Sequence, residues 1–435
     1  MGIKVAKFGG SSLADAAQFR KVKEILLSDP ERRYVVPSAP GRRFDGDDKV
    51  TDLLYRCYHL LESGEDMTEV FDKVTERYVA IARELSLNID VQGLLEQTGR
   101  EIRRVATPDF TASRGEYLNG MLLAAYLDWD FLDPKDYVKF DRQGAFAGEW
   151  TNEILGEALE NHRYAVIPGF YGSVPNGEVR TFSRGGSDIT GAVVARAARA
   201  DLYENWTDVS GFLMADPRIV KNPREIRELT YAELRELSYM GATVLHEDSI
   251  FPVHKAGIPT NIRNTNNPAH PGTMILSRPS KEGGVITGIA GHKNFSFISI
   301  EKAMMNSELG FGRRVLQALE DFAVSFEHLP SGIDTMSVVV ADKELRPRRN
   351  EIVRRIREVC QPDSIEVIEG IALIATVGHG MVRNPGTAAK LFAALDKAHV
   401  NVRMIDQGSS ELNIIVGVDV ADFETAVRAI YEAFV

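Results

Sequence analysis

The chain has 435 residues, of which 44% are hydrophobic and 26% are charged. This composition is typical of a globular protein, and the length predicts roughly two to four domains that need no metal or disulfide to fold. The formal net charge of -11 argues against a nucleic-acid binder, because neutralising phosphates requires a basic face.

The sequence contains no targeting, membrane or metal-binding pattern. Its two cysteines, Cys57 and Cys360, lie far apart and form no C-x-x-C pair, which favours a reducing cytoplasm. No apolar segment follows the first lysines, as a signal peptide would require, and no stretch approaches the ~18 apolar residues of a transmembrane helix. We therefore expect a cytoplasmic chain with no membrane partner and no metal site of its own.

Strands and helices alternate along the first ~280 residues. The pattern predicts a buried strand at 3–8, a helix at 16–27 capped by Asp15, and a strand at 34–36 that ends in a turn cluster. Further helices are expected at 49–61, 67–85, 91–106, 115–127 and 189–198, and further strands at 165–168 and 201–206. Such alternation predicts an α/β fold with a mainly parallel sheet covered by helices on both faces.

The first strand ends in a segment suited to binding phosphate, K-F-G-G-S-S at 7–12. Gly9 and Gly10 allow backbone N–H groups to approach a ligand, and the next helix adds its N-terminus. Ser11 adds a hydroxyl group and Lys7 a full positive charge. The spacing of a Walker A loop is absent, and a plain strand-to-helix turn with a solvated lysine is the alternative.

A second glycine-rich segment, S-R-G-G-S-D at 183–188, comes directly before the predicted helix at 189–198. The guanidinium group of Arg184 could hold a carboxylate through two hydrogen bonds. Ser187 and Asp188 lie near the start of the helix, where an N-cap or a partner for a buried lysine is expected. A role for Asp188 as the N-cap alone is the alternative.

A third cluster, W-T-D-V-S-G at 206–211, follows a strand end, where open α/β sheets bind ligands. Thr207 and Asp208 could contact a nucleotide's ribose or base, and Arg218 could contact its phosphates. A capped turn is the alternative here. The basic residues of the segment 42–49 predict a solvated loop rather than a site.

After residue 284 the pattern changes to two copies of one unit, which align without gaps. The matched pairs are Ile298 with Ile374, Gly310 with Gly386, Leu319 with Leu395, Val324 with Val400, and 338–340 with 414–416. Each copy has the βαββαβ pattern of a ferredoxin-like unit, with chance similarity as the alternative. We expect domains at 1–282, 283–360 and 361–435, with the strand near 285–293 as a candidate to complete the last one. Since paired units of this kind usually bind or associate, we place the chemistry in 1–282.

These motifs together resemble the aspartokinases of the amino-acid kinase fold. Further matches are S-R-G-E at 113–116, M-G-A-T-V-L-H at 240–246 and the repeat, which is similar to tandem ACT domains. The resemblance implies an α/β/α sandwich followed by two ACT domains. It also implies ATP-dependent phosphorylation of the β-carboxylate of L-aspartate, the first step towards lysine, threonine and methionine, with Mg²⁺ held mainly by the ATP phosphates.

The resemblance also implies roles for individual residues. Lys7 would neutralise the transferring phosphoryl group, and Asp188 would orient Lys7. Groups around the phosphates and the nucleotide would be Lys7, Gly9, Gly10, Ser11, Thr207, Asp208 and Arg218. Groups around aspartate would be Ser38, Thr51, Glu116, Arg184 and Ser187. Leu213 and Thr243 stand where the family usually has Tyr and Lys, so the sequence departs from the family on the nucleotide side.

In the same way, the first ACT copy would supply an effector site formed by Met305, Phe311, Gly312, Phe326, Glu327 and Asp334. The acidic Glu327 and Asp334 suit a cationic amino acid, so we expect feedback inhibition by lysine, with threonine second. Ordinary surface carboxylates are the alternative. ACT units associate, so a homodimer or tetramer is expected. The competing functions are another kinase of this fold, acting on acetylglutamate, glutamate or a nucleoside monophosphate, and a non-catalytic amino-acid-binding regulator.

Overall fold

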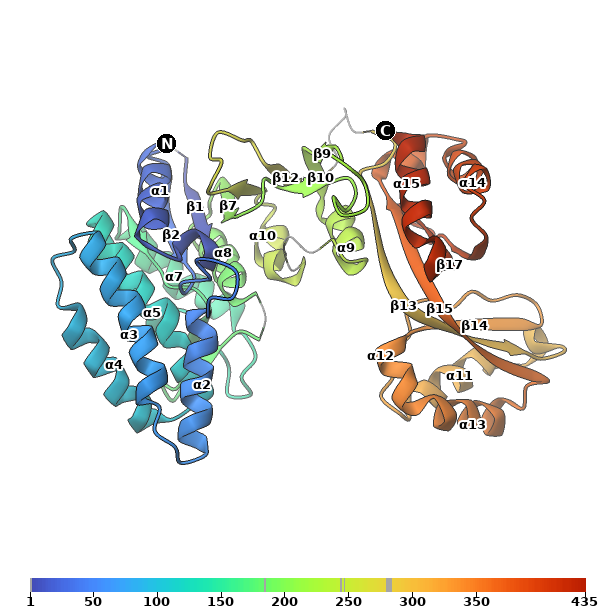
Figure 1. Ribbon diagram of the computed structural model, residues 1–435, viewed down its shortest axis with the longest axis horizontal. Coiled ribbons are helices and arrows are strands. Elements are labelled where there is room, and N and C mark those ends of the chain that lie inside the picture. The colour runs from blue at the N-terminus through green and yellow to red at the C-terminus, as the bar shows by residue number, and fades with distance from the viewer. Residues whose placement is uncertain (1, 184, 243–244, 246, 279–283) are drawn as a thin grey trace. The chain divides into compact units, whose positions relative to one another are not determined.

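The computed structural model describes residues 2–183, 185–242, 245, 247–278 and 284–435. The chain divides into two compact units that interleave in sequence (Figure 1). The first comprises Met1–Phe212, Arg227–Tyr231 and Val244–Pro279, and the second comprises Leu213–Ile226, Ala232–Thr243 and Ser280–Val435. Two segments that precede residue 282 therefore pack within the second unit.

An eight-stranded sheet forms the centre of the first unit, in the order β10-β12-β11-β7-β1-β2-β4-β3. Neighbouring strands are parallel except β11 and β12, so the predicted mainly parallel sheet is confirmed. The strands are β1 (Lys4–Phe8), β2 (Arg32–Pro37), β3 (Asp130–Phe131), β4 (Ala165–Val166), β7 (Leu202–Thr207), β10 (Glu228–Thr230), β11 (Thr260–Asn264) and β12 (Thr273–Leu276). A separate antiparallel hairpin pairs β5 (Tyr171–Ser173) with β6 (Val179–Thr181).

One face of this sheet carries a large apolar core shared with five helices. Ala6 and Phe8 of β1 and Val35 of β2 are fully buried in it. Because side chains alternate along a strand, Lys7 between Ala6 and Phe8 points to the opposite face. The five helices are α1 (Ala16–Leu27), α2 (Val50–Glu62), α3 (Thr68–Glu84), α4 (Val91–Val105) and α5 (Pro108–Leu127).

The opposite face is covered by α8, which packs on β1, β2 and β7 and is itself flanked by α7 and α10. The hydroxyl group of Tyr34 on β2 donates a hydrogen bond to the carbonyl of Leu159 on α7, at 2.8 Å. The unit is thus an α/β/α sandwich. The elements not yet named are α6 (Pro134–Tyr137), α7 (Gly148–Glu160), α8 (Gly186–Ala197), α10 (Phe251–Ala256), and the 3-10 turns η1 (Gly10–Leu13) and η2 (Glu247–Ile250).

Helix α5 begins seven residues before the predicted start at residue 115, and this places the S-R-G-E motif inside the helix. Thr107 caps the N-terminus by accepting a hydrogen bond from the N–H of Phe110, and Pro108 occupies the first turn, where its missing N–H has no consequence. The helix is buried on nearly all sides, so its sequence shows no apolar stripe. That absence explains why periodicity placed its start too late.

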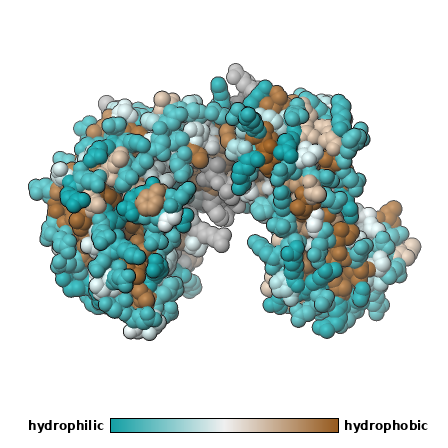
Figure 2. Space-filling model, in the orientation of Figure 1, coloured by the Kyte–Doolittle hydropathy of each residue, from teal (hydrophilic) through white to brown (hydrophobic). Residues whose placement is uncertain are grey.

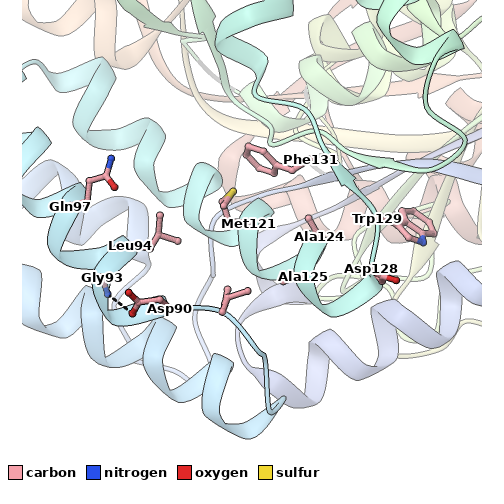
Figure 3. A pocket seen from close by; sticks show the side chains of 11 residues that line it. Asp90, Gly93, Leu94, Gln97, Met121, Ala124, Ala125, Asp128, Trp129 and Phe131 are labelled. Atoms are coloured by element: carbon pink, nitrogen blue, oxygen red, sulfur yellow. Dashed lines mark hydrogen bonds between the residues drawn. The ribbon is translucent and has the colours of Figure 1, made fainter.

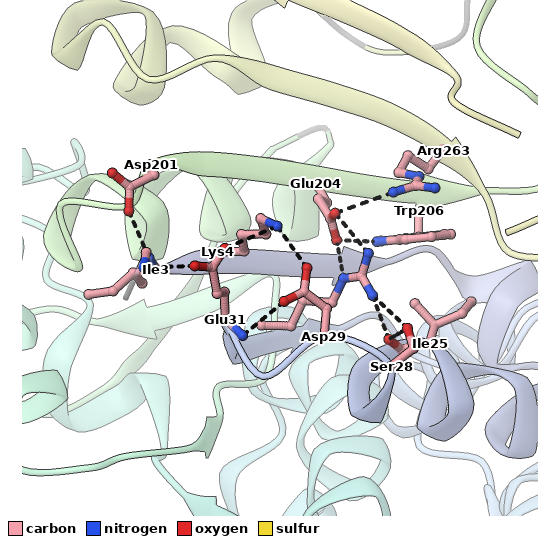
Figure 4. Close-up of polar contacts among 12 residues, drawn as sticks. Ile3, Lys4, Ile25, Ser28, Asp29, Glu31, Asp201, Glu204, Trp206 and Arg263 are labelled. Atoms are coloured by element: carbon pink, nitrogen blue, oxygen red, sulfur yellow. Dashed lines mark hydrogen bonds and ion pairs between the residues drawn. The ribbon is translucent and has the colours of Figure 1, made fainter. Parts of the chain in front are cut away.

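The amino ends of the central strands are joined by an ion-pair network (Figure 4). Arg32 of β2 makes two hydrogen bonds to the carboxylate of Glu204 on β7, at 2.7 and 3.0 Å. The indole N–H of Trp206 donates to the same carboxylate at 3.0 Å, and Lys4 pairs with Asp29 at 2.7 Å. These contacts fix the register of β1, β2 and β7 at the edge remote from their carboxyl ends.

The second unit is built on a five-stranded antiparallel sheet, in the order β14-β13-β15-β17-β16. Its strands are β13 (Gly288–Glu301), β14 (Thr335–Ala341), β15 (Ser364–Val377), β16 (Val402–Asp406) and β17 (Asn413–Asp419). Its helices are α11 (Phe311–Glu320), α12 (Asp342–Leu345), α13 (Arg349–Cys360), α14 (Thr387–Lys397) and α15 (Phe423–Phe434), with 3-10 turns η3 (Met305–Ser307), η4 (Arg346–Arg348), η5 (His379–Arg383) and η6 (Val420–Asp422).

The internal repeat is visible in this sheet. Gly310 and Gly386 both have positive φ, of 77° and 87°, and both cap the helix of their copy, α11 and α14. Such a backbone favours glycine. The matched apolar residues fill two separate cores, one for each copy. The first half of β13 pairs with the last half of β15, a strand of the second copy, so each copy borrows part of its sheet from the other.

Helix α9 (Tyr231–Tyr239) is part of the second unit from Ala232 onwards. The carboxylate of Glu233 accepts hydrogen bonds from the hydroxyl of Thr287 at 2.6 Å and from the N–H of His379 at 2.9 Å. The short strands β8 (Phe212–Leu213) and β9 (Glu225–Ile226) pair with each other in a separate two-stranded sheet.

Hydrophilic residues cover most of the visible surface, and apolar patches are scattered among them (Figure 2). Within the part of the chain that the structure describes, no helix is both long and apolar enough to cross a membrane.

Candidate active site

A buried lysine, Lys7, forms an ion pair with the partly buried Asp188 at the carboxyl end of the central strands. The ammonium group of Lys7 lies 2.6 Å from Oδ1 of Asp188, and the side chain of Lys7 is 8% exposed. The two residues come from β1 and from the first turn of α8, so the expected meeting of a strand-end cation with a helix-start anion is confirmed. A buried cation held in one position is suited to neutralising charge on a phosphoryl group.

The position of Asp188 is fixed by its neighbours. The side-chain amide of Asn205 donates to Oδ1 of Asp188 at 2.8 Å, and Asn205 sits opposite Lys7 in the β1–β7 register. Gly185, with φ of 57°, is the N-cap of α8, so Asp188 is the third residue of the helix and does not cap it. Asp188 is thus free of the capping role and can hold Lys7.

The glycine-rich loop after β1 lies against the segment that follows β2. The N–H of Gly9 donates to the carbonyl of Trp206 at 3.0 Å, and the N–H of Gly41 donates to the carbonyl of Gly10 at 2.8 Å. A Cβ atom on Gly10 would lie 2.9 Å from the carbonyl oxygen of Ala39, closer than real Cβ contacts. Ser11, in η1, is partly buried. Glycine is therefore required at residue 10 by the close approach of two backbones.

Ser38 and Thr51 lie at the same edge of the sheet. The N–H of Ser38 donates to the carbonyl of Phe8 at 3.0 Å, which places Ser38 next to the glycine-rich loop. The side-chain amide of Asn119 donates to the carbonyl of Ser38 at 2.6 Å. Thr51 is the second residue of α2 and is partly buried. These contacts bring the phosphate segment and part of the predicted aspartate segment together.

Glu116 is a buried carboxyl group on the same side. The residue is 5% exposed, and burial raises the pKa of its carboxyl group to about 8, although a hydrogen bond from the N–H of Ala39 and the charge of Lys7 act in the opposite direction. Among the described residues, Oε2 of Glu116 has no hydrogen-bond partner. A buried carboxylate oxygen without a partner is costly, and the ammonium group of a substrate would satisfy it.

Of the other residues expected around aspartate, Ser187 packs on the loop after β4. A Cβ atom on Gly169 would lie 2.6 Å from Oγ of Ser187, so glycine leaves room for that side chain. The N–H of Gly169 donates to the carbonyl of Pro37 at 3.0 Å, which ties this loop to the end of β2. Arg184 lies outside the described residues.

The residues expected to bind the nucleotide are placed in two different units. Thr207 ends β7, and its hydroxyl donates to the exposed Asp208 at 3.1 Å. Arg218 belongs to the second unit, where its N–H and its guanidinium group donate to the carboxylate of Asp216, and its side chain is 87% exposed. Leu213 is 38% exposed. Thr243, where the sequence departs from the family, lies outside the described residues.

Four of the six predicted effector residues lie around the turn before α11. Met305 and Phe311 are buried in the core of the first ACT copy, and Gly312 is the second residue of α11. The carboxylate of Asp334 accepts a hydrogen bond from the N–H of Met304 at 2.8 Å. Asp334 is therefore adjacent to the turn that contains Met305.

The remaining two, Phe326 and Glu327, lie on the segment that pairs with β14. Phe326 is 42% exposed, and the N–H of Glu327 donates to the carbonyl of Val339 at 2.8 Å. The carboxylate of Glu327 accepts a hydrogen bond from the hydroxyl of Tyr239, at the end of α9. The pKa of Tyr239 is raised by burial and by this carboxylate.

Sequence reasoning missed two buried amides, Asn205 and Asn119. Both are polar residues inside regular elements that pack in the interior, and both are almost fully buried. A buried polar side chain is more informative than an exposed apolar one, and that signal could have identified them.

Two hollows in the first unit contain none of the predicted site residues. One, of about 600 Å³, lies between α4 and α5 and is lined mainly by apolar side chains (Figure 3). The other, of about 1060 Å³, lies beside the start of α5 and the β5–β6 hairpin. The chemistry at Lys7 is instead arranged at the carboxyl edge of the sheet, as expected for an open α/β fold.

Comparison with known proteins agrees with this arrangement. The model of the amino acid kinase family matches residues 2–264, and an ACT domain model matches residues 374–434. Aspartokinase 3 of Bacillus subtilis is 41% identical over 99% of this chain and 98% of its own length. The chain belongs to the aspartokinase family.

Solved structures extend the similarity over the whole aspartokinase chain. The crystal structure of Clostridium acetobutylicum aspartate kinase has a TM-score of 0.93 and 53% identity, covering 100% of both chains. E. coli aspartokinase III, at 26% identity, has a TM-score of 0.76 over 99% of both chains, both in complex with aspartate and ADP and in complex with lysine and aspartate. The chain is therefore a kinase with C-terminal ACT domains.

Proposed function

We propose that this aspartokinase transfers the γ-phosphoryl group of ATP to the β-carboxylate of L-aspartate and releases 4-phospho-L-aspartate and ADP. The observation that carries the proposal is the Lys7–Asp188 pair beside the glycine-rich loop, where a Cβ atom on Gly9 would lie 3.7 Å from Nζ of Lys7. The attacking carboxylate is already ionised at neutral pH, so the reaction needs positioning and charge neutralisation rather than a general base.

In this scheme Lys7 neutralises charge on the phosphoryl group. Asp188, held by Asn205, keeps the ammonium group of Lys7 in place. Gly9, Gly10 and Ser11 bind phosphate oxygens. Glu116 receives the substrate ammonium group, with Ser38, Thr51, Arg184 and Ser187 completing the aspartate pocket. Thr207, Asp208 and Arg218 contact the nucleotide. The complexes of E. coli aspartokinase III with aspartate and ADP support the choice of substrates.

The donor set fits a Mg²⁺ ion that arrives with ATP. Across the described ranges, no group of three or more His, Cys, Asp or Glu side chains is placed to hold a metal ion. Mg²⁺ commonly takes phosphate oxygens and keeps several waters, so it needs few protein ligands. The ion would neutralise charge on the ATP phosphates, while Lys7 acts on the group in transfer.

A coupled ADP-release assay tests the proposal, with aspartate, glutamate and N-acetylglutamate offered in turn. Trapping with hydroxylamine identifies the product, because an acyl phosphate forms a hydroxamate and a phosphate ester does not. We expect ADP release and hydroxamate with aspartate alone. ADP release that depends on another acceptor, without aspartyl hydroxamate, would assign a different substrate.

We further propose that lysine inhibits the enzyme through the first ACT copy, and that two chains associate through these units. The carboxylates of Glu327 and Asp334 suit a cationic side chain, and E. coli aspartokinase III has been solved in complex with lysine. The edge strand β16 leaves backbone groups available for association. Activity titrated with lysine and threonine, and the mass measured by light scattering, test these two points.

A further inference from the structure

A buried arginine on α3 connects the two backbone segments that form the candidate site. Arg77 is 5% exposed. Its guanidinium group donates to the carbonyl of Gly41 at 2.9 Å and to that of Ala14 at 3.5 Å. It also donates to the carboxylate of Asp47 at 2.7 Å and to the carbonyl of Asp48 at 3.3 Å. One side chain therefore touches the end of the glycine-rich loop and the segment that leads to Thr51.

These two segments also touch each other directly. Besides the hydrogen bond from Gly41 to Gly10, a Cβ atom on Gly41 would lie 2.6 Å from the carbonyl carbon of Gly10 and 2.7 Å from the N of Ser11. Such close backbone packing leaves one relative position for the segments. Two sets of interactions maintain this position. They are the hydrogen bond from the N–H of Gly41 to the carbonyl of Gly10 and the hydrogen bonds from the guanidinium group of Arg77.

The basic residues of the loop at 42–49 are exposed, as the sequence predicted, but the acidic Asp47 points inward. Asp47 is 7% exposed and accepts hydrogen bonds from the N–H of Arg43 at 3.0 Å and from its guanidinium group at 2.8 Å. The guanidinium groups of Arg43 and Arg77 hold the pKa of Asp47 well below its usual range. The carboxylate of Asp47 is therefore ionised at all working pH values and anchors the loop from the inside.

We propose that Arg77 is a positioning residue, which orders the glycine-rich loop and the 38–51 segment against each other before the substrates bind. Arg77 touches neither reacting group, and the proposal rests on the proposed function for the identity of the substrates. Without the hydrogen bonds from Arg77, the free enzyme samples arrangements in which the two segments separate. The apparent affinity for both substrates then falls in proportion to the competent fraction, while turnover of the bound complex changes little.

The test compares Arg77→Lys and Arg77→Ala with Arg32→Lys and Arg32→Ala. Arg32 is a matched control because it is also buried and also donates to a carboxylate, that of Glu204, but at the opposite, amino edge of the sheet. We expect the Arg77 variants to raise KM for aspartate and for ATP about tenfold, with kcat changed less than about threefold. The Arg32 variants lower the thermal midpoint but leave both KM values unchanged. Millimolar methylguanidinium should lower KM in Arg77→Ala and not in Arg32→Ala.

A second measurement is independent of activity. Trypsin can cleave after Arg42, Arg43 and Lys49, so fragments that begin at residues 43, 44 and 50 report opening of the loop. Below the unfolding temperature, we expect these fragments to form at least about tenfold faster in the Arg77 variants than in the wild type and the Arg32 variants. If Arg77→Ala does not fold, Arg77→Lys supplies both measurements.

Unchanged cleavage and unchanged KM values in a folded Arg77 variant would overturn the positioning role. Loss of activity that follows only the loss of folded protein, as in the Arg32 variants, would also overturn it. Failure of the proposed function is distinguishable, because the wild type would then not phosphorylate aspartate while the trypsin measurement still reports the loop.

Discussion

Lys7 and Lys4 lie on the same strand, so a variant of Lys4 can serve as the control for a variant of Lys7. Lys7 is buried against Asp188, whereas Lys4 lies at the amino edge and pairs with Asp29 and Glu31. We expect Lys7→Ala to lower kcat by a factor on the order of 10²–10³, the usual cost of losing one electrostatic group aimed at transferring charge. Steady-state kinetics with a circular dichroism control measure this.

The matched variant is Lys4→Ala, which removes the same charge from a partly exposed pair and should leave kcat within about twofold. Near-wild-type turnover in Lys7→Ala would remove Lys7 from the chemistry. An equal loss in Lys4→Ala would attribute the effect to the strand rather than to the site.

Glu116 predicts how aspartate binding depends on pH. Its pKa of about 8 leaves most of its carboxyl neutral at pH 7, so binding the substrate ammonium group must first release a proton. We expect KM for aspartate to fall roughly tenfold as pH rises from about 7 to above 8, and to become nearly independent of pH in Glu116→Gln. KM measured in this window at constant ionic strength is the test, and a wild-type profile without pH dependence would contradict it.

Glu116 also makes the free energy of unfolding depend on pH, in a direction that its raised pKa determines. The pKa of Glu116 is raised in the folded chain from 4.5 to about 8, so the folded state holds its proton where the unfolded state has lost it. The contribution to the free energy of unfolding is therefore present below pH 4.5 and is lost as pH rises towards 8. Glu116→Gln should remove this part of the pH dependence of thermal unfolding.

At the scale of elements, the turn between β1 and α1 contains two glycines that the structure uses differently. A Cβ atom on Gly9 would meet its nearest neighbours at 3.6 and 3.7 Å, the second being the ammonium nitrogen of Lys7. A Cβ atom on Gly10 would meet the 39–41 backbone at 2.9–3.2 Å. We expect Gly10→Ala to destabilise the fold by about 1–3 kcal/mol, because the backbone on either side must move.

Gly9→Ala is the matched change. It should leave the thermal midpoint close to wild type but weaken ATP binding, since the added methyl group takes space beside the phosphate-binding charge. Thermal unfolding and KM for ATP distinguish the two substitutions. Equal destabilisation by both would contradict the difference in packing.

Elements with a strong local pattern were predictable from sequence, and those defined by distant contacts were not. Helix α1 has its predicted bounds, 16–27, because five buried apolar side chains share one face and Asp15 caps its start. Strands β11 and β12 belong to the sheet, yet their short sequences, TNIRN and TMIL, show no alternation of apolar and polar residues. The contact of Arg77 with Asp47 spans thirty residues and leaves no local signal. The Lys7–Asp188 pair left a local signal, a cation at a strand end and an acid at a helix start, but its proposed role rested on the resemblance of both glycine-rich motifs to one family.

At the scale of the whole molecule, α9 is the element whose place the sequence least foretold. It follows β10 of the sandwich, yet from Ala232 onwards it packs with the regulatory unit. Glu233 and Glu236 accept hydrogen bonds from residues of the ACT region, and Tyr239 donates to Glu327. Residues 240–246, which resemble a family motif, continue from this helix. Hence most of α9 lies in the same unit as a predicted effector residue, although its sequence precedes residue 282.

The hydrogen bond between Tyr239 and Glu327 leads to a prediction about inhibition by lysine. Tyr239 occupies a hydrogen-bonding position on the carboxylate of Glu327, which a lysine ammonium group would also need. Tyr239→Phe removes the competing donor, so lysine should inhibit at a concentration roughly 2- to 10-fold lower, the worth of one hydrogen bond.

The control is Tyr431→Phe, in which another tyrosine of the same unit loses the hydroxyl that accepts from the N–H of Arg224, far in sequence from Glu327. Lysine titrations of both variants, with uninhibited kcat recorded alongside, provide the measurement. An unaltered titration in Tyr239→Phe would place the effector away from Glu327, and Asp334 beside Met304 would then be the remaining predicted carboxylate for a cationic effector.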